Sequence, residues 1–155
     1  MFSPCALGAV LNYTTIPELK GLTIYYLLHD SYSVAPGEVV LFHAAAGGVG
    51  SLAGHWLRSK GVHAIGTAGG SEKCQIAKAN GFEEVIDNQP EDFVERVMDL
   101  TNGQGVSAVY DSVGKDTIMG SLDCLKTFGP LSTLASRLAY PTSFVLRICH
   151  EDLFS

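Results

Sequence analysis

Short apolar runs alternate along this chain with longer segments in which apolar residues recur every three or four positions. A run that is apolar almost throughout predicts a β-strand covered on both faces, whereas the longer spacing predicts an amphipathic helix. The predicted strands cover residues 39–43, 62–67, 84–86, 106–110 and 130–134. The predicted helices cover residues 17–29, 48–60, 71–80, 90–101 and 116–127.

The order of these elements predicts the fold. Parallel strands joined by helical crossovers form a doubly wound sheet, so we expect a Rossmann-type, three-layer α/β/α fold in a single domain over residues 1–155. Gly61 and Gly81 stand just beyond predicted helices, where a left-handed residue commonly follows, and Pro90 suits a first helical turn. Ligands bind such sheets at the carboxyl ends of the strands, here near the change of direction between the first and fourth strands.

A glycine-rich turn follows the first predicted strand and opens the next predicted helix, because residues 41–50 read LFHAAAGGVG. Glycines let the main chain approach a pyrophosphate, and the new helix directs free N–H groups and the positive end of its dipole toward it. We therefore expect this turn to hold the phosphates of a dinucleotide. The residues expected to line it are Ala46, Gly47, Gly48, Val49 and Gly50.

This turn departs from the strict dinucleotide motif. The pattern G-x-G-x-x-G would fall on residues 45, 47 and 50, so Ala45 replaces its first glycine, and plain loops with three small residues are common. The context favours dinucleotide binding, because a Pro36-Gly37 turn precedes the strand and apolar residues follow the glycines at helical spacing. A purely structural turn remains the alternative.

Three separate blocks of the sequence resemble one family. Residues 18–28 read ELKGLTIYYLL, residues 43–50 read HAAAGGVG and residues 109–114 read VYDSVG. In this order they resemble the NADPH:quinone oxidoreductases, which are the zinc-free, zeta-crystallin-like branch of the medium-chain dehydrogenases/reductases. The resemblance spans about residues 16–134 and covers only the cofactor-binding part of that family. We therefore expect the family's substrate domain to be absent.

The resemblance implies direct hydride transfer from the nicotinamide of NADPH to a quinone-like acceptor without a metal. The family's substrate-side residues belong to the preceding domain, so we assign no catalytic residue. A non-catalytic nucleotide-binding fragment or module is the alternative. A methyltransferase is disfavoured, because it requires an acidic residue for the ribose at the end of the second strand, and residues 65–70 contain none.

The end of the second predicted strand indicates which dinucleotide is bound. An NAD site usually carries an acidic residue there, about 20 positions beyond the glycines. Residues 65–73 read IGTAGGSEK instead, so a hydroxyl and a lysine are available for the extra phosphate of NADP. By the resemblance, Gly69 and Lys73 match residues that hold this 2′-phosphate. We therefore expect NADPH to bind more tightly than NADH.

Four residues qualify this expectation. Ser71, which we include in the phosphate site, also suits a helix N-cap. Glu72 would repel the phosphate unless it is turned away. Asn88 stands where the family often has a tyrosine at the adenosine phosphate, and the loss of that ring would weaken affinity. Lys73 also has a structural alternative as a solvated helix residue.

Further cofactor-lining positions carry over from the resemblance. Thr23 matches a threonine that faces the nicotinamide, although a helix hydroxyl also bonds to its own backbone. Ser112 and Val113 match the loop that follows the fourth strand and lines the cofactor. We interpret Asp111 as a turn former at the strand end, and His43 as a satisfied strand-end or core imidazole rather than a catalytic one.

The C-terminal residues 136–155 form an atypical tail that departs from the family. An altered terminus, an artificial extension and a short sixth strand at residues 144–148 are all open. That segment is apolar and β-prone with one charge, and an unprotected edge strand is a template for pairing. We therefore expect a homodimer or a larger assembly.

Composition and charge narrow the other possibilities. The chain is 46% hydrophobic, as a sheet covered on both faces or a surface prepared for a missing domain would require. Its net charge of −6 disfavours nucleic acid and anionic membranes as partners. No apolar stretch approaches the ~20 residues of a membrane span, and residues 1–10 lack the basic flank of a signal peptide, so we expect a cytoplasmic protein.

The four cysteines predict free thiols rather than a disulfide or a metal site. They form no C-x-x-C pair, and the histidines supply no short ligand spacing either. They are Cys5, Cys74, Cys124 and Cys149. We therefore expect no metal.

Overall fold

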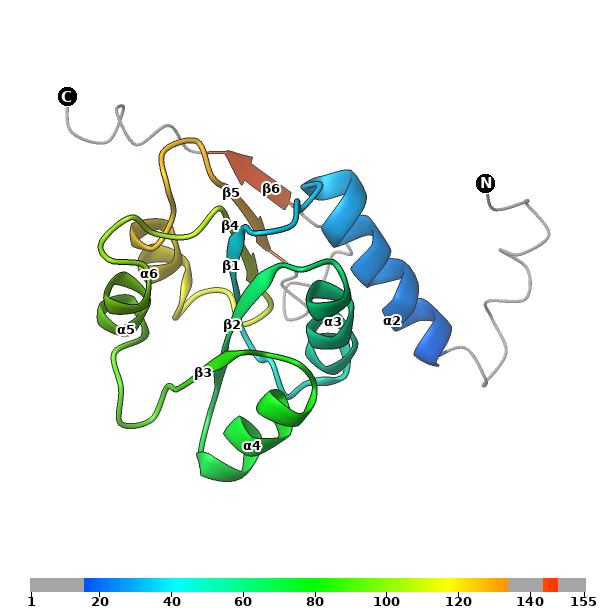
Figure 1. The fold of residues 1–155 in the computed structure, drawn as a ribbon, viewed down its shortest axis with the longest axis horizontal. Coiled ribbons are helices and arrows are strands. Elements are labelled where there is room, and N and C mark those ends of the chain that lie inside the picture. The colour runs from blue at the N-terminus through cyan, green and yellow to red at the C-terminus, as the bar shows by residue number, and fades with distance from the viewer. Residues whose placement is uncertain (1–15, 134–143, 148–155) are drawn as a thin grey trace.

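The structure, a computed structural model, describes residues 16–133 and 144–147, with side chains for residues 20–132. Its strands are β1 (Val39–Phe42), β2 (His63–Ala68), β3 (Glu84–Asp87), β4 (Ala108–Asp111), β5 (Pro130–Thr133) and β6 (Phe144–Arg147) (Figure 1). Its helices are α2 (Ile16–Tyr25), the π-helix η1 (Tyr26–Ser31), α3 (Gly48–Ser59), α4 (Ser71–Ala79), α5 (Phe93–Leu100) and α6 (Ile118–Asp123). No helix in the described ranges is long and apolar enough to cross a membrane.

The strands form a single sheet in the order β3-β2-β1-β4-β5-β6. All neighbours from β3 to β5 are parallel, and the order changes direction between β1 and β4, as the sequence predicts. The tail contributes β6, which pairs antiparallel with β5 at the edge of the sheet. This confirms the predicted short sixth strand, which covers Phe144–Arg147. The doubly wound Rossmann topology is confirmed.

Helices cover both faces of the sheet, so the predicted three layers are confirmed. α2, α3 and α4 lie on one side of the sheet, and α5 and α6 lie on the other (Figure 1). Successive β1 residues point to opposite faces. Val40 and Phe42 belong to the hydrophobic cluster beneath α2 and α3, whereas Leu41 belongs to the cluster on the other face. Two cores explain why the strands are apolar almost throughout.

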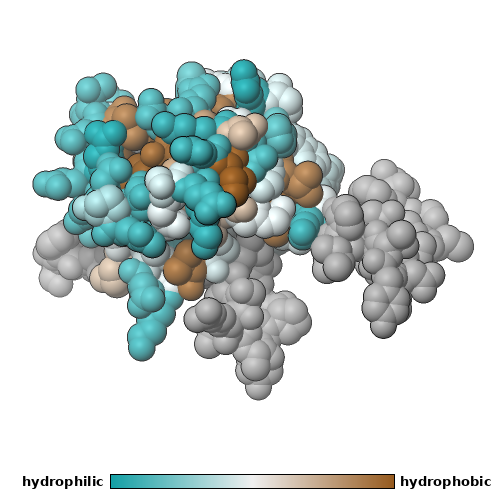
Figure 2. Space-filling view, turned by 90° about the horizontal axis from the view of Figure 1, so that it is seen from below, coloured by the Kyte–Doolittle hydropathy of each residue, from teal (hydrophilic) through white to brown (hydrophobic). Residues whose placement is uncertain are grey.

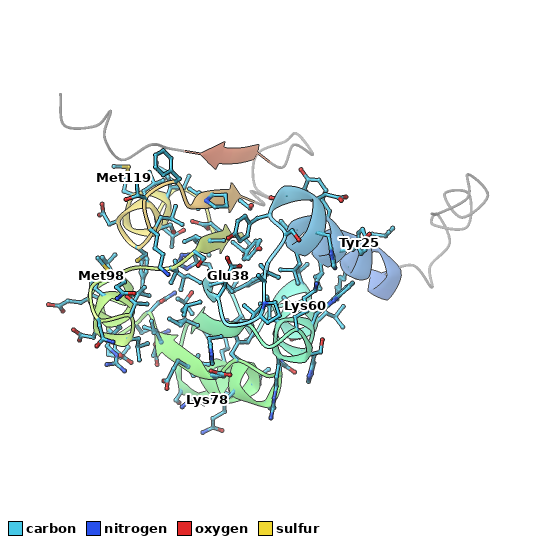
Figure 3. The ribbon with its side chains drawn as sticks, turned by 45° about the horizontal axis from the view of Figure 1, so that its top comes forward. Tyr25, Glu38, Lys60, Lys78, Met98 and Met119 are labelled. Carbon is cyan, nitrogen blue, oxygen red and sulfur yellow. The ribbon has the colours of Figure 1, made fainter. Side chains whose placement is uncertain are left out.

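The surface is more mixed than the overall composition suggests. On the face in Figure 2, hydrophilic residues cover most of the described surface, and hydrophobic residues lie in small separate groups. The largest exposed hydrophobic side chains include Met119 on α6 and Tyr25 on α2, which lie on opposite sides of the sheet (Figure 3).

The helix ends agree with the sequence prediction in part. Gly61 and Gly81 follow α3 and α4 with φ angles of 72° and 104°, as expected of left-handed residues after a helix. The placement of Pro90 in a first helical turn is wrong, because it lies in the turn before α5. Asp92 caps that helix instead, since its carboxylate accepts a hydrogen bond from the N–H of Val94 at 2.9 Å.

Candidate cofactor site

The glycine-rich turn is held between β1 and β2 by backbone hydrogen bonds. Ala45 N–H donates to the Thr67 carbonyl at 2.9 Å, and Gly47 N–H donates to the Ala44 carbonyl at 2.9 Å. The first bond into α3 runs from Ser51 N–H to the Gly47 carbonyl. The N–H groups of residues 48–50 therefore precede the helical series, and such groups are available to a ligand.

Two glycines of this turn are required by close backbone contacts. A Cβ at Gly50 would lie 2.6 Å from the Ala44 carbonyl oxygen and 2.7 Å from that of Ala45. A Cβ at Gly47 would lie 3.1 Å from the Ala44 oxygen, which is tight but less severe. Glycine at these positions lets the turn pack against its own backbone, and the N–H groups of residues 48–50 that this tight turn presents fit a pyrophosphate.

The alanine that replaces the first glycine of the motif has a structural explanation. Ala45 is fully buried, and a Cβ added to Gly66 on β2 would lie 2.7 Å from the Ala45 methyl group. The neighbouring strand thus supplies the glycine that leaves room for Ala45. The positive φ of this turn, 54°, falls on Ala44 instead.

A second turn, at the carboxyl end of β4, lies beside the first. Asp111 Oδ1 accepts hydrogen bonds from the N–H groups of Val113 at 2.8 Å and Gly114 at 2.9 Å. Its Oδ2 accepts from Thr117 Oγ1 at 2.6 Å and from Ser121 Oγ at 3.2 Å. Asp111 is fully buried, and both of its carboxylate oxygens accept hydrogen bonds from the turn and helix that follow β4. The interpretation of Asp111 as a turn former is confirmed.

Ser112 joins the two turns directly. Its hydroxyl donates to the carbonyl of His43 at 3.3 Å, and His43 is the first residue after β1, at the start of the turn that leads to α3. The predicted cofactor residues Ser112 and Val113 therefore lie next to the glycine turn, and the side chain of Val113 is exposed. The fold brings these two predicted regions together at the change of strand direction.

His43 forms the buried link between these elements. Its Nδ1 lies 2.9 Å from Thr67 Oγ1 on β2, and its Nε2 lies 2.9 Å from Ser121 Oγ on α6. Burial lowers the pKa of His43, and the charge of Asp111 raises it to a smaller extent. A neutral, fully hydrogen-bonded imidazole confirms the interpretation of His43 as a satisfied core residue.

The predicted adenosine side lies at the carboxyl ends of β2 and β3. Ser71, Lys73 and Asn88 are all exposed there, and Asn88 N–H donates to the Ala68 carbonyl at 2.9 Å. Gly70, with a φ of 96°, occupies the N-cap position of α4, so the alternative of Ser71 as the helix N-cap is wrong. The structure thus groups Gly69, Ser71, Lys73 and Asn88 around one turn.

Sequence reasoning missed an acidic residue at this turn. It searched the end of β2, whereas Asp87 at the end of β3 lies opposite Ala68 in the parallel register. Asp87 Oδ1 accepts from the N–H groups of Gly70 at 2.9 Å and Gln89 at 3.1 Å. The signal that identifies Asp87 is strand register, because parallel strands end at a common edge. One of its carboxylate oxygens, Oδ1, thus accepts both backbone bonds and holds this turn.

Thr23 is distant from these two turns in sequence, but it lies on the helix next to α3. It is half-buried on α2, and α2 packs against α3. Its role at the nicotinamide stays a prediction.

The structure bears on the metal and cysteine expectations only for the residues that it describes. Cys74 and Cys124 are free thiols, whereas Cys5 and Cys149 lie outside the described residues. Within the described residues, no group of three His, Cys, Asp or Glu side chains is placed to hold a metal ion.

These features together define a class of protein. A parallel sheet that reverses its strand order between β1 and β4, with a bare glycine turn opening α3 at that point, is a dinucleotide-binding Rossmann domain.

The family follows from comparison with known proteins. Residues 48–150 match the family model described as zinc-binding dehydrogenase, and the chain belongs to this family. It is 45% identical over 133 residues to quinone oxidoreductase 1 of Escherichia coli (strain K12). It is 48% identical over 137 residues to 2-haloacrylate reductase of a Burkholderia species. The resemblance to quinone oxidoreductases of the medium-chain dehydrogenase/reductase superfamily is thereby confirmed.

The matches cover most of this chain but a smaller share of the relatives. They include 86% and 87% of the chain but only 41% and 40% of the two relatives, so the chain spans about 40% of their length. A solved structure of Escherichia coli quinone oxidoreductase complexed with NADPH shows the same arrangement. It superposes with a TM-score of 0.71 and 50% identity, over 73% of this chain and 35% of that one.

Proposed function

We propose that this chain is the NADPH-binding part of a quinone oxidoreductase, which transfers hydride from NADPH to a quinone-like acceptor. The observation that carries the proposal is the tight glycine turn at the end of β1, which opens α3 with the N–H groups of residues 48–50 ahead of the helical series. Over 73% of its length the chain is 50% identical to an oxidoreductase solved with NADPH. Bound NADPH supplies the hydride, and the protein binds and orients it.

We assign three parts of the cofactor to three groups of residues. The N–H groups of residues 48–50, with Ala46 and Gly47 beside them, would hold the pyrophosphate. Thr23, Ser112 and Val113 would line the nicotinamide side. The 2′-phosphate would lie at the β2–α4 turn, where the predicted contacts are Gly69, Ser71, Lys73 and Asn88.

Calorimetric titration of the unmutated chain tests this proposal. We expect NADPH to bind more tightly than NADH, because no acidic side chain closes β2 and Lys73 is exposed beside the turn. Equal or tighter binding of NADH would contradict the proposed cofactor preference. Failure to bind either dinucleotide would contradict the function as a whole.

Hydride transfer itself is tested by turnover. A non-catalytic nucleotide-binding module is the competing proposal, and it predicts cofactor binding without reduction of any quinone. Consumption of NADPH with a simple quinone by the chain supports the enzyme. If reduction requires an added substrate domain, the chain supplies only the cofactor site.

We further propose a cytoplasmic homodimer that uses no metal. The absence of paired cysteine spacing supports a reducing compartment, and the net charge of −6 supports a small-molecule substrate rather than a nucleic acid or membrane partner. The edge position of β6 supports pairing between two copies.

A further inference from the structure

Lys20 reaches from α2 to the first turn of α3. A Cβ added to Gly48 would lie 2.5 Å from Lys20 Nζ and 2.7 Å from its Cε, so the ammonium group rests against the backbone of Gly48. Lys20 is half-buried. Among the described residues, neither of the two ion pairs involves it. Glycine at position 48 thus leaves space that the lysine side chain occupies.

This placement is electrostatically unfavourable for the protein alone. The N-terminus of a helix carries a partial positive charge, so a cation there is repelled by the dipole. α3 has no acidic residue in its first turn to offset it. The lysine ammonium thus lies beside the first helical turn, where the N–H groups of residues 48–50 precede the helical series, and an anion bound there would relieve the repulsion.

We propose that Lys20 binds the pyrophosphate of the dinucleotide. This inference rests on the proposed function and adds to it a residue that the glycine motif does not contain. Lys20 and Lys73 then have different roles. Lys73 follows β2, where only NADPH places a phosphate, whereas Lys20 lies beside residues that would bind the pyrophosphate common to NADPH and NADH.

Titration of Lys20→Ala with both dinucleotides tests the inference. We expect NADPH and NADH to lose affinity by a similar factor, about tenfold or more, because one charge-assisted contact is removed. Lys20→Arg, which keeps the charge, should retain most of the affinity. The Kd of the unmutated chain should also increase more steeply with salt than that of Lys20→Ala.

Lys60→Ala is the matched control. Lys60 occupies the C-cap of the same helix (Figure 3), and twelve helical residues place it roughly 18 Å from Gly48, beyond the Debye length of about 8 Å at physiological salt. This variant loses the same charge and should bind both dinucleotides as the unmutated chain does. Circular dichroism and thermal unfolding establish that each variant is folded.

Three results would overturn the inference while the proposed function stands. They are unchanged affinity of folded Lys20→Ala for both dinucleotides, a loss confined to NADPH, and an equal loss in Lys60→Ala. If the unmutated chain binds neither dinucleotide, the proposed function fails and the inference fails with it.

Discussion

At the scale of single residues, we expect Lys73 to set the preference between the two dinucleotides. Its side chain is exposed near the N-terminus of α4, and a lysine contact with phosphate contributes about 1.5–3 kcal/mol, toward the lower end for an exposed group. We expect Lys73→Ala to remove most of the preference for NADPH and to leave NADH affinity unchanged. Calorimetry measures both affinities.

The control for this prediction is Lys126→Ala. Lys126 is exposed, and its N–H donates to the carbonyl of Val106 just before β4, at the opposite edge of the sheet from the β2–α4 turn, so its removal should affect neither cofactor. A Lys73→Ala chain that still favours NADPH as strongly as the unmutated chain would assign the preference to other residues.

His43 makes stability depend on pH. Burial lowers its pKa in the folded state, whereas the unfolded chain has the ordinary value of 6.5. Between these two values the unfolded state binds more protons, so the free energy of unfolding decreases as the pH falls below about 6.5. The decrease amounts to at most about 1.4 kcal/mol per pH unit. Asp111 opposes the shift, which narrows the pH window.

Chemical denaturation at about pH 7.5 and about pH 5.5 tests this prediction. His43→Asn should be less stable at neutral pH, because hydrogen bonds to Thr67 and Ser121 are weakened, but its stability should change less with pH. His55→Asn is the control, since His55 is exposed on α3. The same pH slope in the unmutated chain and in His43→Asn would show that His43 does not carry the effect.

At the scale of elements, substitutions in the glycine turn should affect cofactor binding and protein stability differently. Gly47 has φ −72° and ψ 173°, which valine adopts readily, and its Cβ would meet only the Ala44 carbonyl oxygen at 3.1 Å. We expect Gly47→Val to lose dinucleotide binding while the domain stays folded. Calorimetry and thermal unfolding measure the two effects separately.

Gly50→Ala provides the contrast. Its Cβ would lie 2.6 Å and 2.7 Å from two backbone carbonyl oxygens, so the turn itself must move and the melting temperature should fall. A folded Gly47→Val chain that binds NADPH normally would mean that the turn is purely structural.

Element positions could be predicted because both faces of the sheet are buried, which makes each strand an apolar run. The ends of the elements were harder to predict, because hydrogen bonds with residues elsewhere in the chain determine where a helix stops. The helix predicted over residues 116–127 is shorter, Ile118–Asp123. Thr117 is held by Asp111 at one end, and Lys126 N–H donates to the Val106 carbonyl at the other, so both flanks are drawn out of the helix.

The site could be predicted where it depends on the backbone and less so where it depends on packing. The glycines at positions 47 and 50 follow from local sequence. Asp87 at Gly70 and Lys20 at Gly48 arise from strand register and from the packing of α2 on α3, which join residues that are distant in sequence. A single sequence contains no direct signal for such pairs.

At the scale of the whole molecule, the sheet edge predicts self-association. β6 pairs on one side with β5, and within the described residues no strand pairs with its other side, so that edge is a template for pairing between chains. We expect a homodimer or a larger assembly by light scattering. Val145→Pro removes one N–H group from β6 and should shift the chain toward the monomer. A monomer at high concentration would contradict the prediction.

The central claim is that a dinucleotide binds at the carboxyl ends of β1, β2 and β4, with its pyrophosphate on the backbone of α3's first turn. Titration of the ¹⁵N-labelled chain with NADPH, followed by amide chemical shifts, tests it most directly. We predict the largest shifts at Gly48, Val49 and Gly50, followed by Gly69 and Val113. Absence of shifts at saturating NADPH, or shifts concentrated at the opposite edge of the sheet, would contradict the account.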